Sequence, residues 1–279
     1  MPIKEFLSEG KKDVDRALDR YLPKKGKLAR AMRYSVFAGG KRFRPLLCMA
    51  AAEALGRGSR KVLPIACAIE MIHAFTLIHD DLPAMDNSDF RRGKPSCHKR
   101  FDEVTAILAG DALNTLAFEI LAREIGHPRV ISEIGGALLD VVEGQVLDLE
   151  SEGKKIGLQK LKTIHRLKTA ALLRACLRST AIYLGASSKK LKALTFCAEH
   201  LGLAFQISDD ILDATSTQKQ LGKPVKADIR KGFPYWVGLK KSFKLMGQEK
   251  NKAIAALKIF GKKADSLIQI AGFVVERKR

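Results

Sequence analysis

The spacing of apolar residues restricts the fold of this chain more than any other feature. Apolar residues recur every three to four positions along almost all of its 279 residues, and no convincing run alternates with the period of two that is typical of a strand. Several segments are apolar around most of their circumference, so other helices have to surround them. Aromatic residues make up only 6% of the chain while Ala and Leu dominate, which also favours helix. The sequence predicts an all-α fold.

Breaks that contain glycine or proline divide this pattern into separate helices. After an opening series that includes Val14 and Leu18, we expect helices at 27–38, 44–55, 60–82, 101–108, 110–125, 130–150, 158–183, 188–214, 235–247, 251–260 and 265–276. We find no internal repeat and no low-complexity linker. The length can bury one sizeable core, although two smaller domains are compatible with it. We expect a single domain over residues 1–279, a large helical bundle.

Positive charge is in marked excess and calls for a negatively charged partner. Lys and Arg number 50 against 30 Asp and Glu, a net charge of +20. Residues 214–279 alone hold 16 basic and four acidic residues. Nucleic acid, an anionic membrane or a phosphorylated small molecule would each suit such a charge, and a solvated helix face would explain the basic C-terminal part.

Five cysteines and the apolar segments bear on the cellular compartment. The cysteines form no C-x-x-C pair, so neither a zinc site nor a disulfide framework is indicated, and reduced buried thiols are expected. The first twelve residues lack the apolar core of a signal peptide. The most hydrophobic stretch, 62–78, contains Glu70 and His73 and falls short of a membrane span. We expect a cytoplasmic protein.

Two clusters of aspartates each follow a very apolar helix. Like charges repel at this spacing, and a helix C-terminus disfavours negative charge. Pro83 should end or kink the first helix and turn the chain so that Asp86 faces back toward Asp80. In the second cluster, Asp209 and Asp213 are four residues apart and project from the same helix face. The clusters comprise Asp80, Asp81 and Asp86, and Asp209, Asp210 and Asp213.

Grouped carboxylates of this kind predict a site for a divalent metal. A single cluster is often a helix cap or a solvated turn, but two clusters in the same setting make that interpretation much weaker. Carboxylates without cysteine or a regular histidine pattern suit hard ions such as Mg²⁺, which takes one or two carboxylates together with phosphate oxygens and water. The metal and the positive charge therefore both indicate a phosphorylated substrate.

Basic residues near these clusters could bind its phosphates. Gly39 and Gly40 precede Lys41, Arg42 and Arg44 at an interhelical turn, where glycine lets the backbone approach an anion and arginine offers a planar fork of donors. A basic helix start before Pro45 is the alternative. Arg91 and Arg92 follow the first aspartate cluster closely. His73 lies seven residues before Asp80 on the same helix face, and such a histidine is more often a core residue than a ligand.

The order of these segments resembles a known family. GGKRFRP is followed by IEMIHAFTLIHDDLPAMD, RRGKPSCHK, GDALNTLAFEIL, GQVLDLE, HRLKT and LAFQISDDILD. From about residue 33 to residue 238 this is similar to the trans (E-type) isoprenyl diphosphate synthases of the polyprenyl synthetase family, most like bacterial farnesyl diphosphate synthases. The resemblance implies a helical bundle around a central cavity, across which the two aspartate motifs face each other, and usually a homodimer.

The resemblance also implies residue roles. An allylic diphosphate would bind through Mg²⁺, three ions with the diphosphate present, to Asp80, Asp81, Asp86, Asp209, Asp210 and Asp213. Its basic contacts would be Arg91, Lys168 and Lys223. Isopentenyl diphosphate would bind to Lys41, Arg44, His73 and Arg92. Lys168, Thr169 and Gln206 would lie beside the allylic carbocation, which forms when the C–O bond ionises and is then attacked by the double bond of isopentenyl diphosphate.

Product length depends on the floor of the cavity. Phe75 lies five residues before Asp80, about 7.5 Å down the helix, and its ring would block a growing chain together with Thr76. Within the resemblance this predicts farnesyl diphosphate, with geranyl or geranylgeranyl diphosphate as alternatives. Two departures stand out. Ala170 replaces a frequent glycine, and after Asp213 the cation of the closing loop could be either Arg230 or Lys231.

Other classes of protein explain less of the sequence. A nucleic-acid-binding helical protein accounts for the charge but not for two carboxylate clusters, and no aromatic stacking platform accompanies it. A metal-dependent phosphohydrolase would need a histidine cluster beyond His79 and Asp80. Terpene cyclases share the first kind of motif, but the second DDILD and the GGKRFRP segment favour chain elongation. A non-catalytic subunit would not be expected to retain all six motif aspartates.

Overall fold

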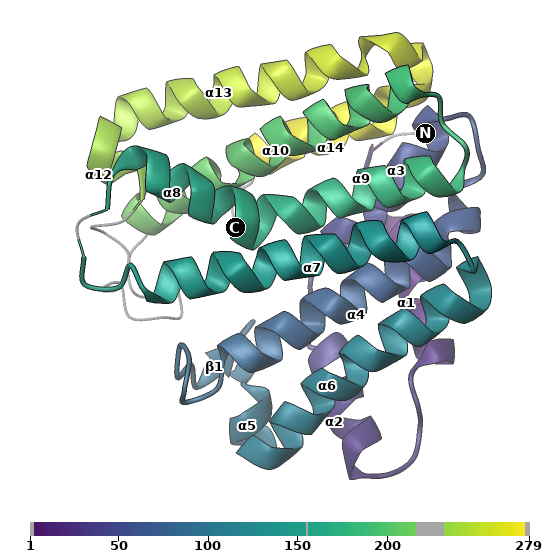
Figure 1. The fold of residues 1–279 in the computed structure, drawn as a ribbon, viewed down its shortest axis with the longest axis vertical. Coiled ribbons are helices and arrows are strands. Elements are labelled where there is room, and N and C mark those ends of the chain that lie inside the picture. The colour runs from purple at the N-terminus through teal and green to yellow at the C-terminus, as the bar shows by residue number, and fades with distance from the viewer. Residues whose placement is uncertain (1–2, 155, 216–231, 277–279) are drawn as a thin grey trace. The chain divides into compact units, whose positions relative to one another are not determined.

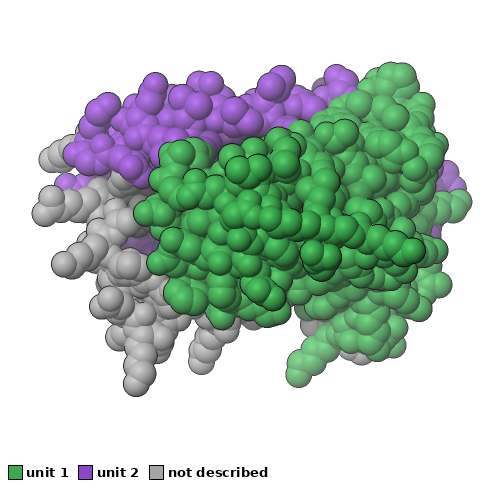
Figure 2. All heavy atoms as spheres, turned by 90° about the horizontal axis from the view of Figure 1, so that it is seen from below, with its two compact units in different colours: residues 1–49, 59–131 green, residues 50–58, 132–279 purple. Residues whose placement is uncertain are grey.

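The computed structural model describes residues 3–154, 156–215 and 232–276, and this part of the chain is mostly helical with only two short strands (Figure 1). The prediction of an all-α fold is confirmed. The chain divides into two compact units, of which unit 1 holds residues 1–49 and 59–131 and unit 2 holds residues 50–58 and 132–279 (Figure 2). Each unit is described by itself below.

Unit 1 is built around one apolar helix, α4 (Leu63–Asp80). From Ile65 to Ile72 every residue of α4 is buried, and Glu70 is the only charged one among them. Such a helix needs neighbours on all sides, and α1, α2 and α6 pack against it. The other elements are α1 (Ile3–Tyr21), α2 (Lys27–Val36), the start of α3 (Phe43–Ala54), η1 (Ser59–Val62), β1 (Phe90–Arg91), β2 (Lys94–Pro95), α5 (Cys97–Arg100), α6 (Glu103–Ile120) and the π-helical turn η2 (Leu121–Ile125).

Unit 2 is built around α10 (Ser188–Thr215), the longest helix, which packs against α9, α13 and α14. Figure 1 shows α13 running along α10. The other elements are most of α7 (Pro128–Leu149), α8 (Leu158–His165), the π-helical turn η3 (Arg166–Ala170), α9 (Ala171–Tyr183), α12 (Phe233–Val237), α13 (Leu239–Ala256), the 3₁₀ segment η4 (Leu257–Ala264) and α14 (Asp265–Glu276).

Two expected helix breaks were wrong. The first, at Ala109, is absent because α6 runs from Glu103 to Ile120 with Gly110 inside it. Packing requires glycine at position 110, because a Cβ there would overlap Nε2 of His79. The second break, after Gly247, is absent because Gly247 lies within α13. An isolated glycine inside a helical pattern is tolerated at a cost of about 1 kcal/mol relative to alanine, and at Gly247 no packing contact requires it, because an added Cβ would meet nothing within 4 Å.

A short hairpin that the periodicity did not predict follows the first aspartate cluster. β1 and β2 pair antiparallel through Phe90 with Pro95 and Arg91 with Lys94. The two residues of the turn have positive φ, 53° at Arg92 and 75° at Gly93. Positive φ at both positions is typical of the type I′ turn that joins the two strands of a tight hairpin. The turn therefore fixes the backbone position from which the Arg92 side chain extends.

The cysteines are as expected for a helical core, but the expectation that the stretch 62–78 falls short of a membrane span was wrong by length and composition. All five cysteines are buried and free, and burial raises the pKa of the Cys197 thiol to about 12. Two segments, Ser59–Asp80 and Glu103–Ile125, are long and apolar enough to cross a membrane. Their most apolar windows are 61% and 44% buried inside the protein, and core helices pass the same test.

Candidate active site

The first aspartate motif forms a tight turn at the end of α4. Asp81 caps the helix, and the chain then turns back, so that the backbone N–H of Asp86 donates to the carbonyl of Asp80 at 2.9 Å. The N–H of Ser88 donates in the same way to the carbonyl of Asp81 at 3.1 Å. The turn predicted from Pro83 is therefore confirmed, and it brings the backbone of Asp86 beside that of Asp80.

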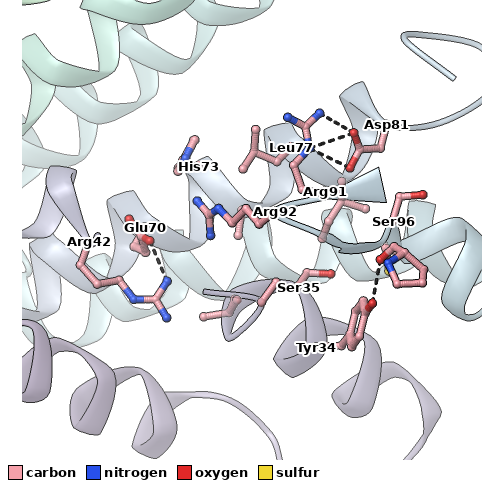
Figure 3. A pocket seen from close by; sticks show the side chains of 16 residues that line it. Tyr34, Ser35, Arg42, Glu70, His73, Leu77, Asp81, Arg91, Arg92 and Ser96 are labelled. Atoms are coloured by element: carbon pink, nitrogen blue, oxygen red, sulfur yellow. Dashed lines mark hydrogen bonds and ion pairs between the residues drawn. The ribbon is translucent and has the colours of Figure 1, made fainter. Parts of the chain in front are cut away.

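Within this motif, Asp81 is held by Arg91 of the hairpin (Figure 3). Asp81 is 2% exposed, and Nε of Arg91 donates to its two carboxylate oxygens at 3.0 and 3.1 Å, while Nη2 also contacts Oδ1. Burial opposes the charge on Arg91, but these hydrogen bonds and the nearby charges of Asp80 and Asp86 outweigh it and raise the pKa of Arg91. The predicted metal ligand and the predicted diphosphate contact thus bind each other.

A pocket in unit 1 lies between α2, α4 and the hairpin, and the Arg92 and His73 side chains line it (Figure 3). The Arg92 guanidinium donates to the carbonyl of Gly39. Gly40 has a φ of 116°, and a Cβ there would lie 2.8 Å from Nη1 of Arg92. The two glycines of the GGKRFRP segment therefore let the backbone pass directly beside this arginine.

The carboxylates of this pocket are bound to other arginines than Arg92. Arg42 is 3% exposed and donates to Glu70 at 2.9 Å and to Asp15 at 2.7 Å. Arg42, which the sequence grouped with Lys41 and Arg44, is therefore a structural residue with two buried or half-buried partners. Within the described ranges, Arg92 forms no ion pair with a carboxylate, so its charge is available to an anionic ligand.

His73 lies among these arginines. Burial, followed by the positive charges of Arg44 and Arg92, lowers the pKa of His73 well below its usual range. The imidazole is therefore neutral near pH 7 and can donate one hydrogen bond without carrying a proton that the arginines would repel. The structure brings together three of the four residues predicted for isopentenyl diphosphate: Arg44, His73 and Arg92. Lys41 is exposed in the loop before α3.

In unit 2 the second aspartate motif occupies the end of α10. Its middle residue, Asp210, accepts a hydrogen bond from the backbone N–H of Phe233 at 2.8 Å and lies 3.2 Å from Nε2 of His165. The rings of His165 and Phe233 stack at 5.8 Å between centroids. A Cβ on Gly232 would lie 3.0 Å from Asp210. Sequence reasoning missed His165 and Phe233, and the only signal was the histidine of the HRLKT segment.

Lys168 and Thr169 lie on the π-helical turn η3, a local widening of the helix that is frequent at functional sites. The Lys168 ammonium donates to Asp148 of the GQVLDLE segment at 2.8 Å. A Cβ on Gly144 would overlap the backbone nitrogen of Lys168, so glycine at 144 lets α7 approach this turn. Gln206 is half-buried on α10, one turn before Asp209.

The departure at Ala170 has a local explanation. Ala170 is 5% exposed and packs against Gly202 of α10, where an added Cβ would overlap the Cβ of Ala170. The methyl group that this chain has at position 170 therefore fills space that Gly202 leaves open. The exchange is a matter of packing between η3 and α10.

The two residues predicted to limit chain length differ in position on α4. The Phe75 ring is half-buried and packs edge-on against His79, with centroids 4.8 Å apart. The Thr76 hydroxyl donates to the carbonyl of His73 at 2.9 Å. Thr76 lies one turn before Asp80 on nearly the same face, whereas Phe75 is rotated away by one further residue. The predicted cations Lys223, Arg230 and Lys231 lie outside the described residues.

The donor set at the two motifs fits magnesium rather than a closed protein cage. In the described part of the chain, no group of three or more His, Cys, Asp or Glu side chains is arranged to hold a metal by itself. Mg²⁺ usually takes one or two protein carboxylates and completes its shell with phosphate oxygens and water. Half-buried Asp80 and exposed Asp86 can supply such carboxylates.

The described residues combine an all-α fold, carboxylates at helix ends, a cationic pocket and apolar core helices, and this combination suits an anionic substrate that is held with a divalent metal. The model of the polyprenyl synthetase family matches residues 25–271. The chain belongs to this family of trans-prenyltransferases, whose substrates are isopentenyl and allylic diphosphates. The resemblance predicted from the motifs is confirmed.

The names of similar proteins agree with membership of this family. A farnesyl diphosphate synthase of Geobacillus stearothermophilus is 46% identical over 241 residues, which cover 82% of this chain and 81% of that protein. A geranylgeranyl diphosphate synthase of Cyanophora paradoxa is 41% identical over 98% of this chain and 95% of its own length. The crystal structure of an FPP/GFPP synthase from Zymomonas mobilis is similar with a TM-score of 0.86 at 38% identity, covering 98% of both chains.

Proposed function

We propose that this chain is a magnesium-dependent farnesyl diphosphate synthase that joins isopentenyl diphosphate to dimethylallyl or geranyl diphosphate. The observation that carries the proposal is the pocket of unit 1, where Arg92 and neutral His73 lie beside the aspartate turn at the end of α4. Relatives named as farnesyl diphosphate synthases at 39–46% identity support the product. Geranylgeranyl diphosphate is the alternative product, since relatives with that name are about as similar.

The metal sites would be formed by the aspartates of both motifs. The proposed ligands are Asp80, Asp81, Asp86, Asp209, Asp210 and Asp213. Mg²⁺, three ions in the full complex, would supply positive charge to the departing diphosphate. The Asp81 carboxylate has lone pairs enough to accept from Arg91 and still ligate a metal.

The chain's own groups would then bind and orient the two substrates. Isopentenyl diphosphate would bind to Arg92, Arg44, His73 and Lys41, with neutral His73 as a hydrogen-bond donor. The allylic diphosphate would be contacted by Arg91, Lys168 and Lys223. Fixed donors of this kind stabilise the charge that develops on a leaving group.

The reaction would proceed in three steps. The allylic C–O bond breaks and its electron pair leaves with the diphosphate. The double bond of isopentenyl diphosphate then attacks the allylic carbon and forms the new C–C bond. A proton is finally lost from the condensed cation to the released diphosphate. The Thr169 hydroxyl and the Gln206 amide would turn their oxygen atoms toward the cation, while Lys168 would act beside them by neutralising the departing diphosphate. The apolar helices would exclude water.

Product analysis tests the proposal directly. The protein is incubated with Mg²⁺, isopentenyl diphosphate and either dimethylallyl or geranyl diphosphate, and the dephosphorylated products are separated by chain length. We expect a C15 product with both primers and none when EDTA removes the metal. A C20 product would select the geranylgeranyl alternative. Absence of any elongated product would overturn the proposal.

Chain length is tested with a pair of opposite substitutions on α4. Phe75→Ala removes a ring from the proposed floor and should lengthen the product beyond C15. Thr76→Phe adds a ring on the face below Asp80 and should shorten it. Leu116→Ala on α6 serves as a control for a general loss of packing. An unchanged product distribution in both α4 variants would contradict the proposal that Phe75 and Thr76 limit the length of the product.

We also propose that residues 1–279 form one polyprenyl synthetase domain that acts as a cytoplasmic homodimer. Exposed apolar residues on α6 support a partner surface: Val104 is 67% exposed, Leu108 52% and Ile107 43%. The sedimentation coefficient of the purified protein should be that of a dimer. Ile107→Glu should shift it toward the monomer, whereas the exposed control Gln159→Glu on α8 should not.

A further inference from the structure

The proposed reaction leaves the basic surface of the C-terminal helices without a role. Of the cations proposed to bind diphosphate, only Lys223 follows residue 213. The stretch 239–264, which forms α13 and η4, contains eight lysines: Lys240, Lys241, Lys244, Lys250, Lys252, Lys258, Lys262 and Lys263. Its one acidic residue is Glu249, which is 7% exposed, accepts from Lys252 at 2.7 Å and contacts His200. This stretch therefore presents cations to solvent and no exposed carboxylate.

Apolar side chains accompany these lysines on α13. The buried residues Ser242, Met246, Glu249 and Ala253 mark the face that packs into unit 2. Outside that face, Leu239 is 41% exposed and Phe243 is 49% exposed, one helical turn apart. Lys240 and Lys244 follow each of them by one residue, so the four side chains form two adjacent rows along one side of the helix. We call these four residues the α13 strip.

The chemistry of the α13 strip matches an anionic lipid surface. A helix that lies in the headgroup region combines lysines with exposed Leu, Phe or Trp on its adjoining face. Lysine stems can extend along apolar surface while their ammonium groups reach the phosphates. A nucleic acid would engage the lysines by charge alone and would leave Leu239 in water. Tyr235 of α12, 45% exposed, extends the apolar surface just before α13.

We propose that the α13 strip docks this protein on an anionic lipid bilayer, with α13 lying in the interface plane. Lysines of the strip meet the lipid phosphates, and Leu239 and Phe243 enter the boundary between headgroups and acyl chains. This contact uses none of the residues proposed for catalysis, so it stands or falls independently of the prenyltransferase reaction.

Vesicle sedimentation tests this proposal. The purified full-length protein is mixed with vesicles of phosphatidylcholine containing one third phosphatidylglycerol, or of phosphatidylcholine alone, at physiological ionic strength. We expect the protein to sediment with the anionic vesicles only. Leu239→Ser with Phe243→Ser should weaken binding about tenfold or more. Lys240→Glu with Lys244→Glu should abolish it, since each basic residue near such a surface contributes about fivefold.

Controls separate docking from a general effect of charge or folding. Lys189→Glu with Lys190→Glu changes the same charge at two exposed positions of α10 and should leave most of the binding intact. All variants should keep the thermal stability and the solution activity of the parent. The proposal would be overturned if the variant Leu239→Ser with Phe243→Ser bound the vesicles as strongly as the parent and the parent bound duplex DNA equally well. Such a result would indicate attraction to any polyanion. Failure of the parent protein to sediment would also overturn it.

Discussion

Asp81 and Asp210 occupy the same place in the two aspartate motifs, but their partners differ. Each is the second residue of an Asp-Asp pair near the end of an apolar helix. Asp81 is bound by a cation, the guanidinium of Arg91. Asp210 is bound by the backbone N–H of Phe233 and lies beside His165. In both motifs the second carboxylate binds a segment that follows later in the chain. The two aspartates nevertheless differ in their electrostatic environment, because Asp81 has a cationic partner and Asp210 has a neutral backbone donor.

The largest effect should come from the first aspartate of each pair. Asp80→Asn and Asp209→Asn each remove a proposed metal ligand, and we expect kcat to fall about a thousandfold, which corresponds to about 4 kcal/mol of transition-state stabilisation. The loss is measured at saturating Mg²⁺ and both substrates. Unfolding curves should show that both variants remain folded. A loss below tenfold in either variant would contradict its role as a metal ligand.

Stability should distinguish the two second aspartates. Asp81→Asn leaves Arg91 without its buried counter-charge and should cost about 3 kcal/mol of unfolding free energy. Asp210→Asn keeps an oxygen that can accept from Phe233, so its cost should be about 1 kcal/mol. Denaturant unfolding measures both. The double variant Asp81→Asn, Arg91→Gln should regain part of the lost unfolding free energy. Equal losses in Asp81→Asn and Asp210→Asn would contradict the proposed difference between the two aspartates.

Two glycines test how each unit accommodates its site. Gly144→Ala in unit 2 would drive a methyl group into the backbone of Lys168, and this backbone cannot move without the helix that carries it. Gly110→Ala in unit 1 meets the ring of His79, a side chain that can rotate away. We expect the unfolding free energy to fall by about 2 kcal/mol in Gly144→Ala and by less in Gly110→Ala. Both values include the gain in helix propensity from glycine to alanine. Thermal unfolding of the two variants compares them, and a larger loss for Gly110→Ala would reverse this order.

The smallest effect concerns pH and the pocket of unit 1. Because the pKa of His73 is lowered in the folded protein, the unfolded chain takes up a proton at His73 as the pH falls through about 6.5 and the folded protein does not. His73 therefore makes the unfolding free energy decrease on acidification, by at most about 1.4 kcal/mol per pH unit. The decrease between pH 7 and pH 5.5 should be shallower in His73→Gln. Parallel curves for parent and variant would show that the pKa of His73 is not lowered in the folded protein.

Local features of the sequence were enough for the helices and the motif positions. The apolar period of α4 and the position of Pro83 predicted a helix that ends near Asp80 and a turn that returns at Asp86. The family followed from the order of the motifs. The helix and turn signals depend on residues within one or two helical turns of each other, where covalent geometry and the helical repeat decide the outcome.

Only the tertiary structure decided which charges pair with which. Arg42 stands in the same basic segment as Lys41 and Arg44, yet it is buried against Glu70, 28 residues away. Phe233 reaches Asp210 across 23 residues and His165 reaches it across 45. No local pattern encodes such pairs, because they form only when packing has brought distant helices together and removed the water that otherwise solvates each charge. The sequence by itself determined an all-α prenyltransferase with two carboxylate motifs, and the packing determined which carboxylates and cations hold the site in place.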